Sequence, residues 1–247
     1  MTTPLAGAMP HFFSNRPRVH ALVRRAGNIG LHFRWETVNA AFYTLGGLIF
    51  VFGSVLFFPS LSAWENVGAG AFLAGSLLYL LVTGHDVFEV IASHRDRGRR
   101  RSVWRVLEFW AAVAYLVGTL LFVAGSVFFF SAFDWIGPGA WCFLVGSALF
   151  LLGAVVNVLE IIFADTLKTL QLLNLTAISF IVGSTLFCVA SIPFLWELSS
   201  DADRRLLGAY LAWLFLVGSG LFLAGGLFNY WRAWLVVRAD TRASGPA

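Results

Sequence analysis

Residues 109–133 read FWAAVAYLVGTLLFVAGSVFFFSAF and contain no Asp, Glu, Lys or Arg. These 25 residues are long enough for a bilayer-spanning helix, which needs about 20 apolar residues. Because lipid offers no partner to an unpaired backbone amide, such a stretch is expected to be helical. Further charge-free stretches lie at 37–64, 66–85, 135–159, 169–196 and 206–231. The sequence therefore predicts an all-α membrane bundle of six transmembrane helices.

The composition of the whole chain excludes a water-soluble globule. The 247 residues are 59% apolar and 12% charged, whereas a soluble domain is about a quarter charged. The two cysteines, Cys142 and Cys188, exclude a disulfide scaffold and the common zinc-finger spacings. The chain also has no phosphate-binding loop, His-Glu-x-x-His motif or nucleophile elbow. We therefore expect no enzyme, no catalytic or metal-binding residues and no cofactor.

Turn-forming residues divide the six stretches into three helical hairpins. The breaks are Pro59-Ser60, residues 134–138 and residues 199–201. Of the 17 basic residues, only Arg204 and Arg205 lie in the three connections that contain these breaks. Basic segments stay on the cytoplasmic side, so both termini are predicted to be cytoplasmic, in the inner (plasma) membrane.

Two short sequences recur along the chain and indicate an internal repeat. The first reads FVFGSV at 50–55, FVAGSV at 122–127 and FCVASI at 187–192. The second reads FLAGSL at 72–77, FLVGSA at 143–148 and FLVGSG at 215–220. Each copy begins and ends on the same side, so the three hairpins are predicted to be parallel repeats. The predicted segments are 1–35 (basic, with an interfacial helix as one interpretation and a disordered arm as the other), 36–91 (repeat 1), 92–105 (basic loop), 106–165 (repeat 2), 166–238 (divergent repeat 3) and 239–247 (tail).

Glycines within the stretches recur seven residues apart, for example Gly46 and Gly53. Seven residues are nearly two helical turns, so these glycines share one face and let neighbouring helices approach closely. Helix packing is the favoured interpretation over a lipid-binding or pore-lining seam. The predicted packing residues are Gly46, Gly53, Gly68, Gly75, Gly118, Gly125, Gly139, Gly146, Gly183, Gly218 and Gly225.

The repeat is similar to the YrhK-like membrane domain, a two-helix module with an aromatic-rich run, Gly-Ser, Phe-Phe and a second Phe-Leu-x-Gly-Ser. Residues 34–91 resemble it most, 105–162 resemble a second copy and 172–234 a degenerate third. The resemblance implies a bacterial inner-membrane protein, and it carries over no functional residues. It rests on Arg34-Trp35-Glu36, Asn39, Gly53-Ser54, Phe57-Phe58-Pro59 and residues 72–78.

Polar residues recur in the same register near the predicted cytoplasmic ends of the helices. One interpretation is a ring of carboxylates and amides that attracts cations or relays protons. The favoured interpretation is an interfacial belt, in which Glu36, Glu108, Glu89 and Glu160 pair with Arg34, Arg105, Arg95 and Arg232. A metal shared by His85 and Glu89 is disfavoured, because no further ligand converges on them. The candidate cluster is Glu36, His85, Asp86, Glu89, Glu108, Asn157, Glu160, Asn229 and Arg232.

The arginines of the second connection are candidates for binding anionic lipid headgroups: Arg95, Arg97, Arg99, Arg100 and Arg101. Enforcing topology alone is an equally good explanation of them. We expect membrane lipids as partners, with a second copy or a membrane protein as alternatives, and no nucleic acid, because no folded domain positions the arginines.

Two functions compete at this point. The favoured one is a non-catalytic integral membrane module that interacts with lipid or protein. The alternative is a small ion or solute permease along the axis of the three hairpins.

Overall fold

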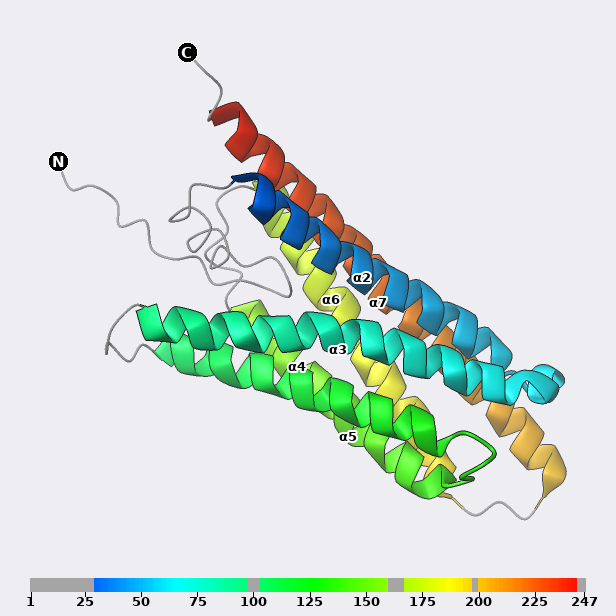
Figure 1. Cartoon of the computed structure of the whole chain (residues 1–247). Helices are drawn as coiled ribbons and strands as arrows, with labels where there is room; N and C mark the ends of the chain where they lie inside the picture. Colours follow the sequence, from blue (N-terminus) through cyan, green and yellow to red (C-terminus); the bar gives the residue numbers. More distant parts are fainter. Residues whose placement is uncertain (1–28, 97–102, 160–166, 197–199, 244–247) are drawn as a thin grey trace.

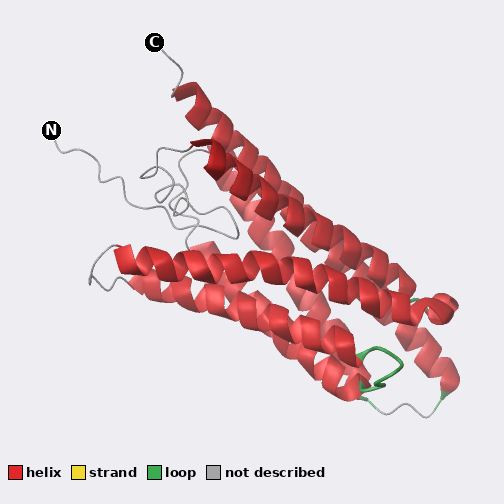
Figure 2. Ribbon diagram, viewed as in Figure 1, coloured by secondary structure: helices red, strands yellow, loops and turns green. Residues whose placement is uncertain are grey.

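The computed structural model describes residues 29–96, 103–159, 167–196 and 200–243, and these residues form helices joined by short turns (Figures 1 and 2). Six helices are long and apolar enough to cross a membrane, and no strand occurs in the described ranges. The prediction of an all-α chain with six helices able to span a membrane is therefore confirmed. The long helices are α2 (Ile29–Leu56), α3 (Glu65–Asp96), α4 (Val103–Phe128), α5 (Ile136–Leu159), α6 (Leu167–Ser191) and α7 (Asp201–Ala243), with the 3-10 helices η1 (Pro59–Trp64) and η3 (Ile192–Leu195).

The helix boundaries follow local chemistry. Pro59 lies in the first turn of η1, where its missing amide hydrogen costs nothing. Asp134 adopts a positive φ of 50° in the turn before α5, a conformation that Asp tolerates better than most residues. At the start of α7, the Asp203 amide donates to Ser200 Oγ at 3.4 Å. Asp201 and Asp203 in its first turn also complement the helix dipole.

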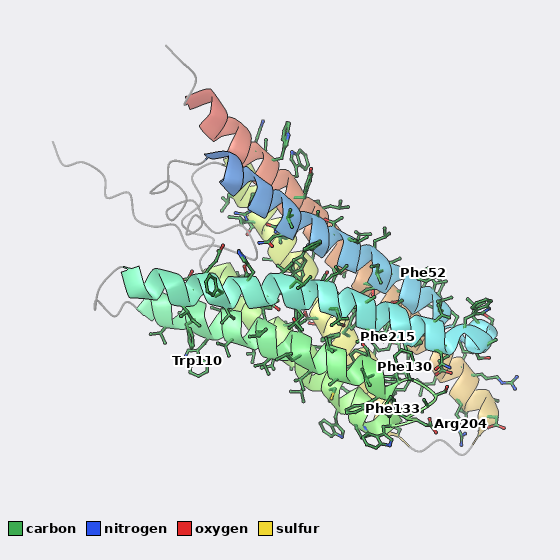
Figure 3. The ribbon with its side chains drawn as sticks, viewed as in Figure 1. Phe52, Trp110, Phe130, Phe133, Arg204 and Phe215 are labelled. Atoms are coloured by element: carbon green, nitrogen blue, oxygen red, sulfur yellow. The ribbon has the colours of Figure 1, made fainter. Side chains whose placement is uncertain are left out.

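The six long helices form a closed ring. Each packs mainly against the helix before it and the helix after it, and α7 packs against α2. The start of α2 and the end of α7 lie at the same end of the bundle, called here the termini end (Figure 1). The outward faces are apolar, and the exposed side chains of Phe52 and Trp110 point away from the bundle (Figure 3). Such an exterior is suited to contact with lipid.

Aromatic side chains fill the axis of this ring. Phe72, Phe143 and Phe215 come from α3, α5 and α7, which are not neighbours in the ring. Their ring centroids nevertheless lie 5.9, 6.1 and 6.4 Å apart, so the three rings meet at the axis. The aromatic residues of this core cluster other than Phe42, called here the axial rings, are Tyr43, Phe50, Phe57, Phe72, Tyr79, Tyr115, Phe122, Phe129, Phe143, Phe150, Phe180, Phe187, Phe194, Phe215 and Phe222.

Glycines provide the space into which the axial rings fit. A Cβ added to Gly75 would lie 2.8 Å from the ring of Phe50, and one added to Gly218 would lie 2.7 Å from Phe187. In α5, a Cβ on Gly146 would lie 3.0 Å from both the Gly118 carbonyl oxygen and the Phe122 ring. The predicted packing glycines therefore admit an aromatic ring from the partner helix, in addition to allowing close backbone approach. A larger residue at these positions would push the ring toward the axis.

Serines follow several of these glycines, and in one case Ala190, and are completely buried. Ser54, Ser76, Ser126, Ser147, Ser191 and Ser219 all have 0% exposure. Their hydroxyls need partners because water is absent, and Ser54, Ser126 and Ser191 donate to carbonyl oxygens four residues earlier in the chain. Ser54 also contacts Ser219 across the interface between α2 and α7. Small polar side chains thus lie where α2 and α7, helices from different predicted hairpins, contact each other.

Candidate functional site

A buried polar cluster lies at the termini end of the axis. Along α3 the axial positions recur every seven residues, so that Phe72 and Tyr79 are followed by Asp86. The same spacing leads from Phe150 to Asn157 in α5 and from Phe222 to Asn229 in α7. The polar side chains therefore continue the series of axial rings, and Asp86, Asn157 and Asn229 are 2%, 3% and 2% exposed. We call Asn39, His85, Asp86, Glu89, Asn157, Asn229 and Arg232 the polar cluster.

Hydrogen bonds within the cluster connect different helices. His85 Nδ1 on α3 lies 3.4 Å from Asn39 Nδ2 on α2 and 3.5 Å from Glu89 Oε1 on the next turn. The Asn157 amide on α5 donates to the Tyr115 hydroxyl on α4 at 2.9 Å. The bond from Asn157 joins the cluster to the last layer of axial rings, which contains the three tyrosines Tyr43, Tyr79 and Tyr115.

The cluster also contains a buried cation. Arg232 donates to Asn229 Oδ1 from Nη2 at 3.0 Å and from Nε at 3.3 Å, and its side chain is buried. The carboxylates of Asp86 and Glu89 are buried at the same end of the bundle. Burying a charge in an apolar protein costs free energy unless an opposite charge compensates it. The cation and the carboxylates at this end therefore lower the cost of burying one another.

The burial of these groups differs from the favoured expectation of a solvated interfacial belt. Glu89 is 3% exposed and contacts His85. Its expected pairing with Arg95 stays a prediction, because the side chain of Arg95 lies outside the described part of the structure. Arg232 contacts Asn229, and its expected partner Glu160 lies outside the described residues. Glu108 is partly buried. The side chains of Glu36, Arg34, Arg95 and Arg105, and residues 97, 99, 100 and 101, also lie outside the described part of the structure.

Sequence reasoning missed two members of this arrangement. Asn39 was noted only for the family resemblance, although it holds His85 from the neighbouring helix. Tyr115 was not singled out, although its hydroxyl receives the amide of Asn157. The sequence did contain a signal for Tyr115. It lies seven residues after Glu108, and this spacing places the two side chains on one face of the helix.

The nearest approach to a metal site is also in this cluster. One ligand atom each of His85, Asp86 and Glu89 lies within 4.8 Å of the other two. All three come from a single turn of α3, and zinc sites in proteins take three or four protein ligands around a tetrahedron. The arrangement can hold a proton or attract a cation. The described residues bring no fourth ligand of the same kind to it.

The comparisons with known proteins identify the repeated unit. The family model described as YrhK-like protein matches the chain twice, over residues 33–91 and 105–162. The resemblance of these two segments is therefore confirmed, and the third copy at 172–234 stays a prediction. Searches of curated proteins and of solved structures found no match.

Proposed function

We propose that this chain, which carries two YrhK-like domains in tandem, is a non-catalytic membrane module that interacts with lipid or with a partner protein. The observation that carries the proposal is the filled axis. Rings from non-neighbouring helices meet there, as Phe122 and Phe187 do at 5.8 Å. A bundle closed in this way offers its outer faces and its two ends for interaction, with no continuous path along its centre.

The proposed topology is three parallel hairpins with both termini in the cytoplasm. It is supported by the common location of the start of α2 and the end of α7 (Figure 1) and by the many basic residues in the sequence before α2 and between α3 and α4. The test places a single cysteine at Gly98 in a chain whose Cys142 and Cys188 are replaced by alanine. A membrane-impermeant thiol reagent should label it in inverted vesicles and not in intact cells, and labelling in intact cells would contradict the topology.

The proposed lipid contact lies in the basic segment between the first two hairpins. Each Lys or Arg near an anionic surface contributes about 1 kcal/mol to membrane attraction, so five arginines in seven residues make a strong site for anionic headgroups. The test is native mass spectrometry of the full chain purified with its lipids. Replacing Arg95, Arg97, Arg99, Arg100 and Arg101 by glutamine should remove most of the bound anionic lipid.

A control makes the same kind of substitution at the other end of the bundle, where it removes two positive charges instead of five. Arg204 and Arg205 lie at the start of α7 and are exposed, so replacing both by glutamine should leave the retained anionic lipid unchanged. Equal lipid retention by the loop variant and by the unaltered chain would contradict lipid binding at this segment. A retained second polypeptide in the same spectra would favour the partner-protein form of the proposal.

The permease stays as a second candidate because of one observation. Ionisable residues buried inside membrane proteins mark ion or proton pathways more often than they mark packing, and Asp86 and Glu89 are such residues. This candidate requires the axial rings to move aside during transport. Its test is the movement of ions or protons into sealed proteoliposomes, which the module proposal forbids.

A further inference from the structure

The axial rings close the middle of the bundle but do not extend to the end opposite the termini end. A cavity of about 210 Å³ lies there, between the turn after α2, the start of α3 and the first turns of α7. Its floor is formed by axial rings, including Phe72, Phe143 and Phe215. Apolar cavities of about 150 Å³ stay dry and take up benzene, so this volume accepts a molecule somewhat larger than benzene.

Two features of the sequence explain why the cavity exists. The axial series of α3, α5 and α7, continued by seven residues beyond Phe72, Phe143 and Phe215, reaches Glu65, Ile136 and Gly208. No aromatic ring is available at these positions to form another layer. Gly208 lines the cavity and leaves its side-chain space empty except for Pro59, which a Cβ would meet at 3.3 Å.

The second feature is that Phe194 has no glycine on which to pack. Phe129 packs on Gly139, where an added Cβ would lie 2.9 Å from the ring, and Phe57 packs on Gly68 in the same way at 3.3 Å. The equivalent position in α7, seven residues before Gly218, is Leu211. A leucine cannot receive the ring, and Phe194 instead contacts Phe129 at 5.5 Å and Phe215 at 6.2 Å.

Rings from several helices surround the cavity. Phe57 lies 6.5 Å from Phe129 and 6.4 Å from Phe215, and it packs more closely on Phe72, at 5.1 Å. All four rings line the cavity, so a ligand in it would contact aromatic surface from more than one side.

One charged side chain lines this cavity, whose other lining residues are aromatic or aliphatic apart from Gly208 and the polar Ser62. Glu65, at the start of α3, lies on the cavity wall and is exposed to the surroundings. Aromatic rings attract cations through their negatively charged faces, and a carboxylate beside them adds a charge of the matching sign. From this combination we propose that the cavity is a binding site for a small organic cation, an ammonium carried on an aromatic or aliphatic body.

The experiment measures equilibrium binding of radiolabelled benzyltrimethylammonium to the full chain in lipid nanodiscs. Neopentylbenzene, which has the same shape without the charge, serves as the competing neutral compound. The cation should bind saturably, and the neutral compound should compete only weakly. Glu65→Gln should weaken binding of the cation about fivefold, as expected for a partly solvated charge pair, and leave the competition by neopentylbenzene unchanged.

Two further variants locate the site. Ala212 is buried and lines the cavity, so Ala212→Leu should occupy the space and abolish binding of both compounds. Asp134→Asn removes an exposed carboxylate at the same end outside the cavity lining and should change nothing. Absence of saturable binding, or equal affinity for the two compounds with no effect of Glu65→Gln, would overturn the proposal. Because Glu65 is on the surface, its variant remains informative even if Ala212→Leu does not fold.

Discussion

Ser54 Oγ on the first helix of the ring lies 2.9 Å from Ser219 Oγ on the last, and both side chains are completely buried. Ser54 already donates its only hydroxyl proton to the Phe50 carbonyl oxygen at 2.8 Å. The bond between the two serines is therefore donated by Ser219. It joins residues 165 positions apart in the chain and closes the ring between α7 and α2.

This contact predicts a measurable coupling between the two serines. Hydrogen bonds between membrane helices contribute about 0.6 kcal/mol on average and up to about 1.7 kcal/mol. A double-mutant cycle with Ser54→Ala and Ser219→Ala, measured by unfolding in mixed detergent, should give a coupling energy in this range. Thr185 is exposed and bonds within its own helix, so Ser54→Ala and Thr185→Ala should be additive. Additivity of the serine pair as well would contradict the closing contact.

Gly146 and Gly220 provide a matched test of the ring-on-glycine packing. Gly146→Ala places a methyl group 3.0 Å from a backbone oxygen that cannot move cheaply, so we expect a loss of about 1–3 kcal/mol in unfolding free energy. A Cβ on Gly220 meets nothing within 4 Å, and Gly220→Ala should be neutral or stabilising by up to about 1 kcal/mol. Equal effects of the two substitutions would exclude specific packing at Gly146.

The bond between Asn157 and Tyr115 predicts a cost for removing a single hydroxyl. Tyr115→Phe preserves the ring but leaves the buried Asn157 amide without the acceptor that it contacts at 2.9 Å. A buried donor that loses its partner costs about 1–3 kcal/mol, which thermal unfolding of the purified protein would detect. Tyr210 is exposed, and Tyr210→Phe should leave stability unchanged. A neutral Tyr115→Phe would show that the amide finds another acceptor.

Much of the helix content could be predicted from the sequence, because a lipid environment requires each long apolar stretch to satisfy its own backbone. The helices nevertheless extend beyond the charge-free stretches: α2 begins at Ile29 and α7 continues to Ala243. Charged residues can continue a helix once it has left the hydrocarbon region, since their side chains reach water. Hydropathy alone therefore marks the spans and leaves their outer turns undefined.

The packing partners could not be predicted, because they depend on which helices become neighbours. The spacing of Gly46 and Gly53 marked one face of a helix, but it did not reveal that aromatic rings occupy that face. Gly47 was missed, although an added Cβ there would lie 2.8 Å from Leu223 Cα on α7. Only closure of the ring brings these two helices together.

Only part of the polar cluster could be predicted, for a similar reason. The sequence shows that Asp86, Asn157 and Asn229 share one register, which predicts that they lie at the same depth along their helices. Their burial could not be inferred from depth, because it depends on the axial rings beneath them and on the neighbouring helices around them.

The group of His85, Asp86 and Glu89 predicts a negative result with metal. Its three ligands all come from one turn of one helix, so they approach an ion from one side, whereas the ligands of a zinc site surround it as a tetrahedron. Zinc added to the full chain should leave the unfolding temperature unchanged, and the unaltered chain and His85→Gln should respond alike. A saturable rise in unfolding temperature that His85→Gln removes would contradict this expectation.

The central claim is that the axial rings close the bundle, and ion movement across sealed proteoliposomes tests it most directly. Vesicles that contain the full chain and a pH-sensitive or cation-sensitive dye receive a gradient of protons, sodium or potassium, with protein-free vesicles as the baseline. The account predicts that the dye signal decays at the baseline rate for every ion. Faster decay that Asp86→Asn abolishes would contradict it, because ions would then pass along an axis that we describe as filled.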